Sequence, residues 1–129
     1  MKICRVCSKQ KSLEEFGTDR QRKDGKHTDC KECDSEYSHR KNVAKYGLTY
    51  EQYLQMFNMQ NGRCAVCCRV LVMREHNTEN TPMIDHSAAT GKVRGILCRH
   101  CNWAIGHALD DPDLLRDLAA YIEGSMHLV

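Results

Sequence analysis

Eight of the nine cysteines in this chain fall into four C-x-x-C pairs, and these pairs limit the folds open to it more than any other feature. One such pair supplies two thiolates from a single backbone turn, and two pairs complete the tetrahedral shell of a structural zinc ion. In chain order the pairs form two sets of four: Cys4, Cys7, Cys30 and Cys33, then Cys64, Cys67, Cys98 and Cys101. We therefore predict two structural zinc sites.

The ninth cysteine, Cys68, directly follows Cys67, so the two compete for one place in the second set. The C-x-x-C spacing is the commoner zinc knuckle, which favours Cys67 and leaves Cys68 as a packed free thiol. A thiol redox protein is the competing interpretation of such pairs. A redox role does not explain why the four C-x-x-C pairs form two sets of two.

The composition predicts a small core that needs such staples. The chain has 129 residues, of which 41% are hydrophobic, and small scaffolds of this kind depend on metals or cross-links. The first residues are charged and lack the apolar segment of a secretory signal, and no apolar stretch is long enough to span a bilayer. We expect a cytoplasmic, intracellular protein whose paired cysteines bind metal in a reducing compartment.

The positive charge is concentrated at the N-terminal end. Residues 1–45 hold 12 Lys and Arg against 8 Asp and Glu, whereas residues 46–129 hold 7 against 9. Two zinc ions, each bound by four thiolates, would change the formal net charge from +2 to about −2. Binding to nucleic acid would then depend on local basic patches and bound metal, and not on the overall charge.

Two helix starts flank the second cysteine set. Thr49 is a good N-cap, and Gln52 follows three residues later to complete a capping box. Asp111 precedes Pro112, which is the usual order of an N-cap and a first helical residue. We expect both helices to bury an apolar stripe against the second cysteine module. The stripe of the second helix comprises Leu114, Leu115, Leu118, Ala119 and Ile122.

The segment between these helices predicts two short strands and a third helix. Met83–His86 and Val93–Leu97 have strand-like apolar residues, and a loop with Gly91 separates them. The last cysteine pair then leads into residues 102–109, which are compatible with a helix. We therefore predict a small, zinc-stapled α+β fold: a ββα-metal finger with flanking helices in residues 46–129, preceded by a small zinc-binding module in residues 1–45.

Over residues 46–123 the sequence resembles the HNH, or ββα-metal, endonucleases, and among them the phage recombination endonuclease VII family. The resemblance rests on several short motifs in the family's order, which are Tyr46-Gly47-Leu48-Thr49, Gly62-Arg63-Cys64-Ala65-Val66-Cys67, Ile84-Asp85-His86, Thr90-Gly91-Lys92-Val93-Arg94-Gly95-Ile96-Leu97-Cys98, Cys101-Asn102 and Asp110-Asp111-Pro112. The N-terminal cysteine module is similar to small zinc-binding segments that precede such nuclease domains.

The resemblance implies that Asp85 and Asn102 hold one catalytic divalent cation, Mg²⁺ or Mn²⁺, and that His86 is the general base. The chemistry of the residues agrees with these roles. An imidazole titrates near neutrality and accepts a proton from water. Carboxylate and amide oxygens suit a hard cation that stabilises charge on a phosphodiester and its leaving group. Adjacent strand residues face opposite ways, so Asp85 and His86 share a site only if the strand ends or bulges there.

The sequence departs from the family pattern at two places. Many members have a second Asp-His directly after the first, where this chain has Ser87-Ala88, and Ile105 stands where we expect an acidic residue. The minimal set of base and metal ligands is intact. The departures leave the type of DNA substrate open, whether duplex or branched.

Three cations near these motifs, Lys92, Arg94 and Arg99, are candidates to bind DNA phosphates, with a solvated charge as the alternative for each. We expect Trp103 to belong to the core. The predicted function is a metal-dependent DNA endonuclease, phage-encoded and acting in the host cell, with DNA as partner, no membrane, and a homodimer left open. The alternative is a zinc-ribbon module that binds nucleic acid without cleaving it.

Overall fold

The computed structural model describes residues 1–125, which form two compact units that divide between Thr49 and Tyr50. The sequence-based division between residues 45 and 46, and the separate roles given to the two parts, stay predictions. No helix in the described part of the chain is both long and apolar enough to cross a membrane.

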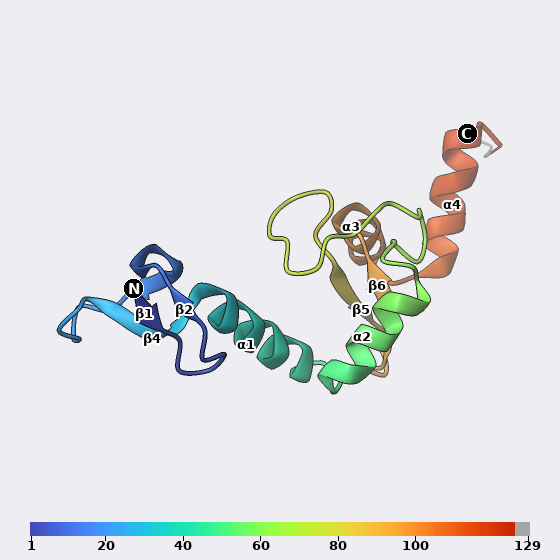
Figure 1. The fold of residues 1–129 in the computed structure, drawn as a ribbon. Helices are drawn as coiled ribbons and strands as arrows, with labels where there is room; N and C mark the ends of the chain where they lie inside the picture. The colour runs from blue at the N-terminus through green and yellow to red at the C-terminus, as the bar shows by residue number, and fades with distance from the viewer. Residues whose placement is uncertain (126–129) are drawn as a thin grey trace. The chain divides into compact units, whose positions relative to one another are not determined.

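The N-terminal unit is built from two short hairpins and one helix (Figure 1). Its elements are β1 (Lys2–Ile3), β2 (Gln10–Lys11), the 3-10 helix η1 (Leu13–Glu15), β3 (Phe16–Thr18), β4 (Lys26–Cys30) and α1 (Lys31–Ala44). Both strand pairs are antiparallel. The turn between β3 and β4 closes through the Asp19 N–H, which donates to the carbonyl of Gly25 at 2.8 Å.

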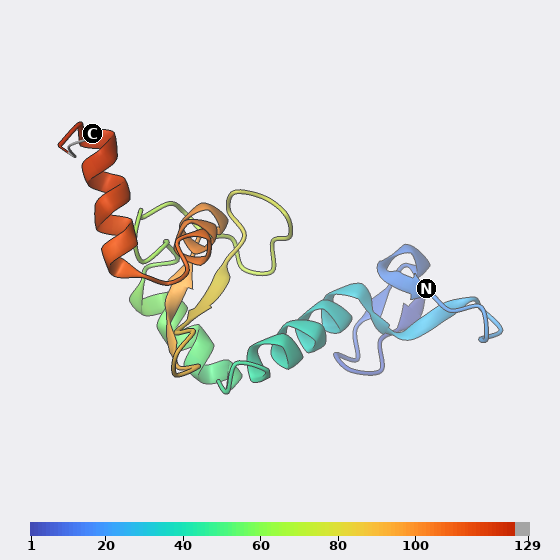
Figure 2. The same cartoon turned by 180° about the vertical axis from the view of Figure 1, so that it is seen from behind.

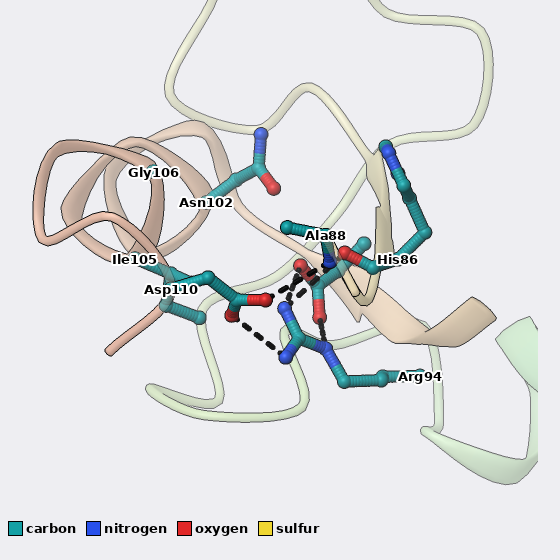
Figure 3. Close-up of a pocket in the computed structure, with 8 residues that line it drawn as sticks. His86, Ala88, Arg94, Asn102, Ile105, Gly106 and Asp110 are labelled. Atoms are coloured by element: carbon teal, nitrogen blue, oxygen red, sulfur yellow. Dashed lines mark hydrogen bonds and ion pairs between the residues drawn. The ribbon is translucent and has the colours of Figure 1, made fainter. Parts of the chain in front are cut away.

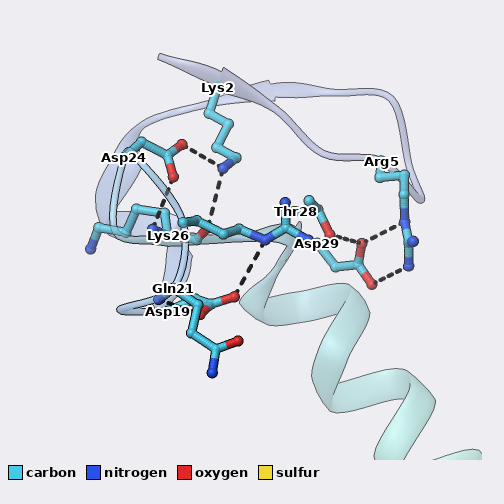
Figure 4. A network of polar contacts seen from close by, with 9 residues as sticks. Lys2, Arg5, Asp19, Gln21, Asp24, Lys26, Thr28 and Asp29 are labelled. Atoms are coloured by element: carbon cyan, nitrogen blue, oxygen red, sulfur yellow. Dashed lines mark hydrogen bonds and ion pairs between the residues drawn. The ribbon is translucent and has the colours of Figure 1, made fainter.

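The core of this unit is very small, since it is formed by Phe16 with Cys4 and Cys30. Ion pairs bind the surface strands together around it, and Figure 4 shows those between Lys2 and Asp24 and between Arg5 and Asp29. Several of the cations that give the N-terminal end its positive charge are therefore already paired within the unit.

The C-terminal unit has the predicted order of strand, strand and helix. Its elements are α2 (Tyr50–Met59), β5 (Met83–His86), β6 (Val93–Leu97), α3 (Arg99–His107) and α4 (Pro112–Glu123). The strands β5 and β6 form an antiparallel hairpin, and α3 contacts both of them. Figure 2 shows this hairpin beside α3 from behind. The structure thus confirms the small α+β fold with a ββα arrangement.

Gln60, just after α2, completes the hydrogen bonding of β6. Its side-chain amide donates to the Ile96 carbonyl at 2.8 Å, and its carbonyl oxygen accepts from the Ile96 N–H at 3.0 Å. Ile96 is fully buried. The Gln60 side chain therefore makes the hydrogen bonds with Ile96 that a third strand would otherwise make. Gly95 leaves room for this approach, because a Cβ at that position would lie 3.3 Å from the Gln60 oxygen.

Both predicted helix starts are confirmed. The helix α2 begins at Tyr50, directly after Thr49. In α4, the Asp111 side chain caps the first turn by accepting from the Asp113 N–H at 2.9 Å, with Pro112 as the first helical residue.

Two burial predictions are wrong. The apolar stripe of α4 is largely uncovered, with Leu118 47% and Ile122 83% exposed, because α4 projects away from β5, β6 and α3 (Figure 1). Trp103 is 49% exposed and lies outside the core. Its ring stacks on the guanidinium of Arg99, 5.0 Å from the ring centroid, one turn earlier on α3.

We expect Gln60→Ala to lower the free energy of unfolding by about 2 kcal/mol, because the buried Ile96 N–H loses its acceptor. The Ile96 carbonyl loses one of two donors and keeps the Ala65 N–H at 3.2 Å. Gln55→Ala, which removes an exposed amide from α2, is the matched control and should change stability by only a few tenths of that value. Urea unfolding of the zinc-loaded protein measures both. Equal effects of the two substitutions would show that Gln60 has no special role.

Candidate active site

The eight paired cysteines come together as two separate clusters, and in each cluster the four sulfur atoms all lie within 4.8 Å of one another. The Sγ atoms of Cys4 and Cys33 are 3.8 Å apart, and those of Cys67 and Cys98 are 3.6 Å apart. A tetrahedral zinc with Zn–S bonds of about 2.3 Å has sulfur–sulfur edges of roughly 3.8 Å. The donor set and its spacing therefore fit zinc.

The surroundings of each cluster favour the thiolate form at some of its cysteines and oppose it at others. Burial of Cys4 works against ionisation, but backbone N–H groups at Cys7, Cys30 and Val6 outweigh it and lower the pKa of Cys4 to about 6. The same balance lowers the pKa of Cys64 to about 6. In the first cluster the Lys11 ammonium also donates to the Cys30 sulfur at 3.3 Å. In the opposite direction, the side-chain hydrogen bond with Cys30 raises the pKa of Cys33 to about 12, and burial raises the pKa of Cys101. Thiolates are the form that binds zinc, so zinc binding would release the protons that remain on the clusters.

Cys68 lies outside the second cluster and is exposed, not packed as we expected. Its backbone has a φ of +64°, in the left-handed region. The N–H of Cys68 donates to the Cys64 carbonyl at 3.1 Å and closes the knuckle turn. The chain therefore leaves the knuckle at Cys68, while Cys67 remains with the other sulfurs.

A pocket beside the second cluster collects the predicted catalytic residues. Asp85, His86 and Asn102 all line it, as do Ala88, Arg94, Ile105, Gly106 and Asp110. The strand β5 contributes Asp85 and His86, and α3 contributes Asn102. Asn102 directly follows Cys101, and its N–H donates to the carbonyl of Cys98 at 3.0 Å. The cluster and the pocket thus share the first turn of α3.

A β-bulge lies beside the two adjacent residues Asp85 and His86, which both line the pocket. Asp85 pairs with Gly95, but the next residue, His86, pairs with Val93, so Arg94 is the extra residue on β6. The sequence left open whether the strand of Asp85 and His86 ends or bulges here; β5 ends at His86, and the bulge lies on its partner strand. A bulge also changes the direction of the side chain it carries. In a regular ladder Arg94 would face the side of His86, whereas here it reaches Asp85.

Arg94 is held by three groups of the pocket (Figure 3). Its Nε and Nη2 donate to the two carboxylate oxygens of Asp85 at 2.8 and 3.0 Å, and its Nη1 donates to Asp110 at 2.8 Å. Nη2 also donates to the His86 carbonyl at 3.3 Å. The hydrogen bonds to Asp85 and then to Asp110 raise the pKa of Arg94 above its usual range. Arg94 is thus a cation held by the pocket, with its side chain 40% exposed.

Asp110 was not among the predicted site residues. Leu109 and Asp110 both have a φ of +57°, and this left-handed turn after α3 directs the carboxylate of Asp110 back into the pocket. The carboxylate accepts from the Ala88 N–H at 3.0 Å. That hydrogen bond and the one from Arg94 lower the pKa of Asp110. The only sequence signal was the Asp110-Asp111 doublet, in which Asp111 has the separate role of helix cap.

The other two predicted DNA contacts are not in the pocket lining. Lys92 is exposed on the loop between the strands. Arg99 is partly buried under Trp103, and its Nε has no hydrogen-bond partner within residues 1–125. Ile105 lines the pocket at the position where we expected an acidic residue. DNA binding by Lys92, Arg94 and Arg99 stays a prediction.

The residues of the pocket fit a divalent cation that remains largely hydrated. Asp85 and Asn102 offer oxygen ligands on one pocket, and Mg²⁺ commonly takes one or two protein oxygens and keeps several waters. Both oxygens of Asp85 accept from Arg94, yet each carboxylate oxygen has a second lone pair.

A protein-family model identifies the family of this chain. The family model described as recombination endonuclease VII matches residues 38–124. The Gene 59 proteins of Mycobacterium phages L5 and D29 are 33% and 36% identical over 81 residues, which cover 62% of this chain and 46% of each relative. The chain therefore spans about half the length of these relatives. Among solved structures, the ββα-Me type II restriction endonuclease Hpy99I has a TM-score of 0.41 and 18% identity, covering 96% of this chain and 65% of that chain.

The cysteine doublet supplies a matched test of the second cluster. We expect the purified protein to contain two zinc ions per chain, Cys67→Ser to lose one of them, and Cys68→Ser to retain both, because only Cys67 belongs to the cluster. Elemental analysis after dialysis against a weak chelator measures the zinc content. Loss of zinc from Cys68→Ser, or two full equivalents in Cys67→Ser, would contradict the assignment.

Proposed function

We propose that this chain, which belongs to the recombination endonuclease VII family, is a metal-dependent DNA endonuclease that hydrolyses phosphodiester bonds at the pocket of Asp85, His86 and Asn102. The observation that carries the proposal is the convergence of a carboxylate, an imidazole and a carboxamide from two elements on one pocket. The imidazole can act as the base that activates water, and the carboxylate and carboxamide can supply oxygen ligands to a hard cation.

In the proposed mechanism His86 is the general base. Its imidazole accepts a proton from the water that attacks the phosphorus atom of the scissile phosphate. His86 lines the same pocket as its neighbour Asp85. A positioned base of this kind contributes on the order of 10²- to 10⁴-fold to a hydrolysis rate.

Asp85 and Asn102 are the proposed ligands of a catalytic Mg²⁺ or Mn²⁺. When bound, this ion stabilises negative charge on the phosphate and the leaving 3′ oxygen. The chain's own part is to hold the two oxygen ligands in place. Asp85 is held by Arg94, and Asn102 follows a cysteine that is proposed to bind structural zinc. The two cysteine clusters are proposed to hold structural zinc only, since four sulfurs leave no open position for water.

The proposed substrate is DNA, duplex or branched, which is nicked or cut. Lys92 and Arg99 lie outside the pocket lining, where we propose that they position the DNA backbone without reading its sequence. The relatives in Mycobacterium phages L5 and D29 support a phage-encoded protein, and the family match supports DNA as its substrate. Action inside the host cell is part of the proposal. Two copies of the chain, one for each strand, would be needed for a double-strand break.

We expect purified protein with Mg²⁺ or Mn²⁺ to convert supercoiled plasmid into nicked or linear forms. His86→Ala should lower the cleavage rate by about 10²- to 10⁴-fold, because the water loses its base. His76→Ala, which removes an exposed histidine from the loop before β5, is the matched control and should retain cleavage. Gel electrophoresis of timed samples gives the rates, and zinc content confirms that each variant is folded.

If His86→Ala cleaves DNA at the wild-type rate, His86 is not the general base. Salt-sensitive DNA binding by the wild type, without cleavage under any divalent metal, would instead favour the zinc-ribbon binding module.

A further inference from the structure

We propose that Arg94 is the resident counter-ion of Asp85, and that its positive charge sets how tightly the active site binds a divalent cation. This inference rests on the proposed function of the pocket and adds a residue that controls its metal affinity. In this role Arg94 is a positioning and tuning residue that acts through Asp85. It differs from the DNA-phosphate contact that we predicted for Arg94 from the sequence.

The first step is the burial of Asp85. Its exposed fraction is 7%, and within residues 1–125 it is the only charged residue in the buried class. A buried carboxylate without a counter-charge is strongly unfavourable. The fork of Arg94 supplies that charge through two hydrogen bonds, so the carboxylate is paired and ordered before a metal ion arrives.

The second step is that Arg94 is fixed in this position. The bulge makes it the extra residue of β6 and directs it toward Asp85. The Nη1 of Arg94 donates to the Asp110 carboxylate, and its Nη2 donates to the His86 carbonyl. Asp110 is itself anchored by the Ala88 N–H from the loop after β5. The cation is therefore held by groups from two segments of the chain, β5 and the turn after α3, which limits its freedom to leave when a second cation approaches.

The third step is the charge balance. Asp85, Arg94 and Asp110 together carry one net negative charge, whereas without Arg94 the two carboxylates carry two. A divalent cation on Asp85 lies within a few ångströms of the guanidinium and is repelled by it. Removal of the charge should therefore strengthen metal binding. A purely structural role predicts the opposite sign, because a disordered Asp85 binds metal more weakly.

The test is Mn²⁺ binding to the zinc-loaded full chain, measured from the electron paramagnetic resonance signal of free Mn²⁺. We expect Arg94→Gln to lower the Kd by on the order of tenfold, after allowance for screening by solvent. Arg94→Lys, which keeps the charge and loses the fork, should bind within about twofold of wild type if charge is the determinant. Asp110→Asn should bind Mn²⁺ more weakly than wild type.

The exposed ion pair of Arg116 and Asp113 on α4 provides matched controls. Arg116→Gln and Asp113→Asn make the same charge changes outside the pocket lining and should leave the Kd for Mn²⁺ unchanged. Zinc content and circular dichroism establish that each variant is folded.

Three results would overturn the proposal. Equal or weaker Mn²⁺ binding by a folded Arg94→Gln would assign Arg94 a structural role. A large loss of affinity in Arg94→Lys would assign the role to the geometry of the fork, and this result does not depend on the folding of Arg94→Gln. Absence of saturable Mn²⁺ binding in the wild type would overturn both this inference and the proposed metal ligands, which distinguishes the two failures.

Discussion

The four sulfurs of the second cysteine cluster bring two distant turns of the C-terminal unit to one point, and the placement of the candidate site follows from this convergence. Cys98 is the last residue before α3, and its sulfur accepts from the Cys101 N–H as the cap of that helix. The cluster therefore determines where β6 ends and where α3 begins. Asn102 is placed beside the hairpin as a direct result. Gln60 secures the other edge of β6. The pocket is thus formed by interactions outside its own lining, as a preorganised site requires.

Local departures from regular geometry give the pocket its polar lining. The bulge on β6 turns Arg94 toward Asp85, and the left-handed turn at Leu109 and Asp110 brings a second carboxylate to the same guanidinium. Such conformations are less favourable than regular ones and persist when their surroundings hold them. Here the hydrogen bonds and ion pairs of the pocket do so. The result is an internal charge network on the carboxylate that we propose as a metal ligand.

Much of this architecture could be predicted because its signals are local. The spacing of the cysteines predicted two clusters, and Asp111-Pro112 predicted the start of α4. The features that were missed depend on tertiary contacts. A single doublet cannot show that Asp110 faces the pocket, because the backbone turn that directs it has no glycine. Trp103 was expected in the core on its residue type alone, yet the inner face of α3 is occupied by its contacts with the hairpin.

We propose that Asp85 and Asn102 hold one divalent cation in the pocket that His86 lines. The most direct measurement is an anomalous difference map from crystals of the full chain grown with Mn²⁺. We expect one manganese peak about 2.0–2.4 Å from oxygen atoms of Asp85 and Asn102. Each cysteine cluster should in addition hold a zinc peak. Zinc peaks in both clusters with no manganese at Asp85, under conditions that support DNA cleavage, would contradict this proposal.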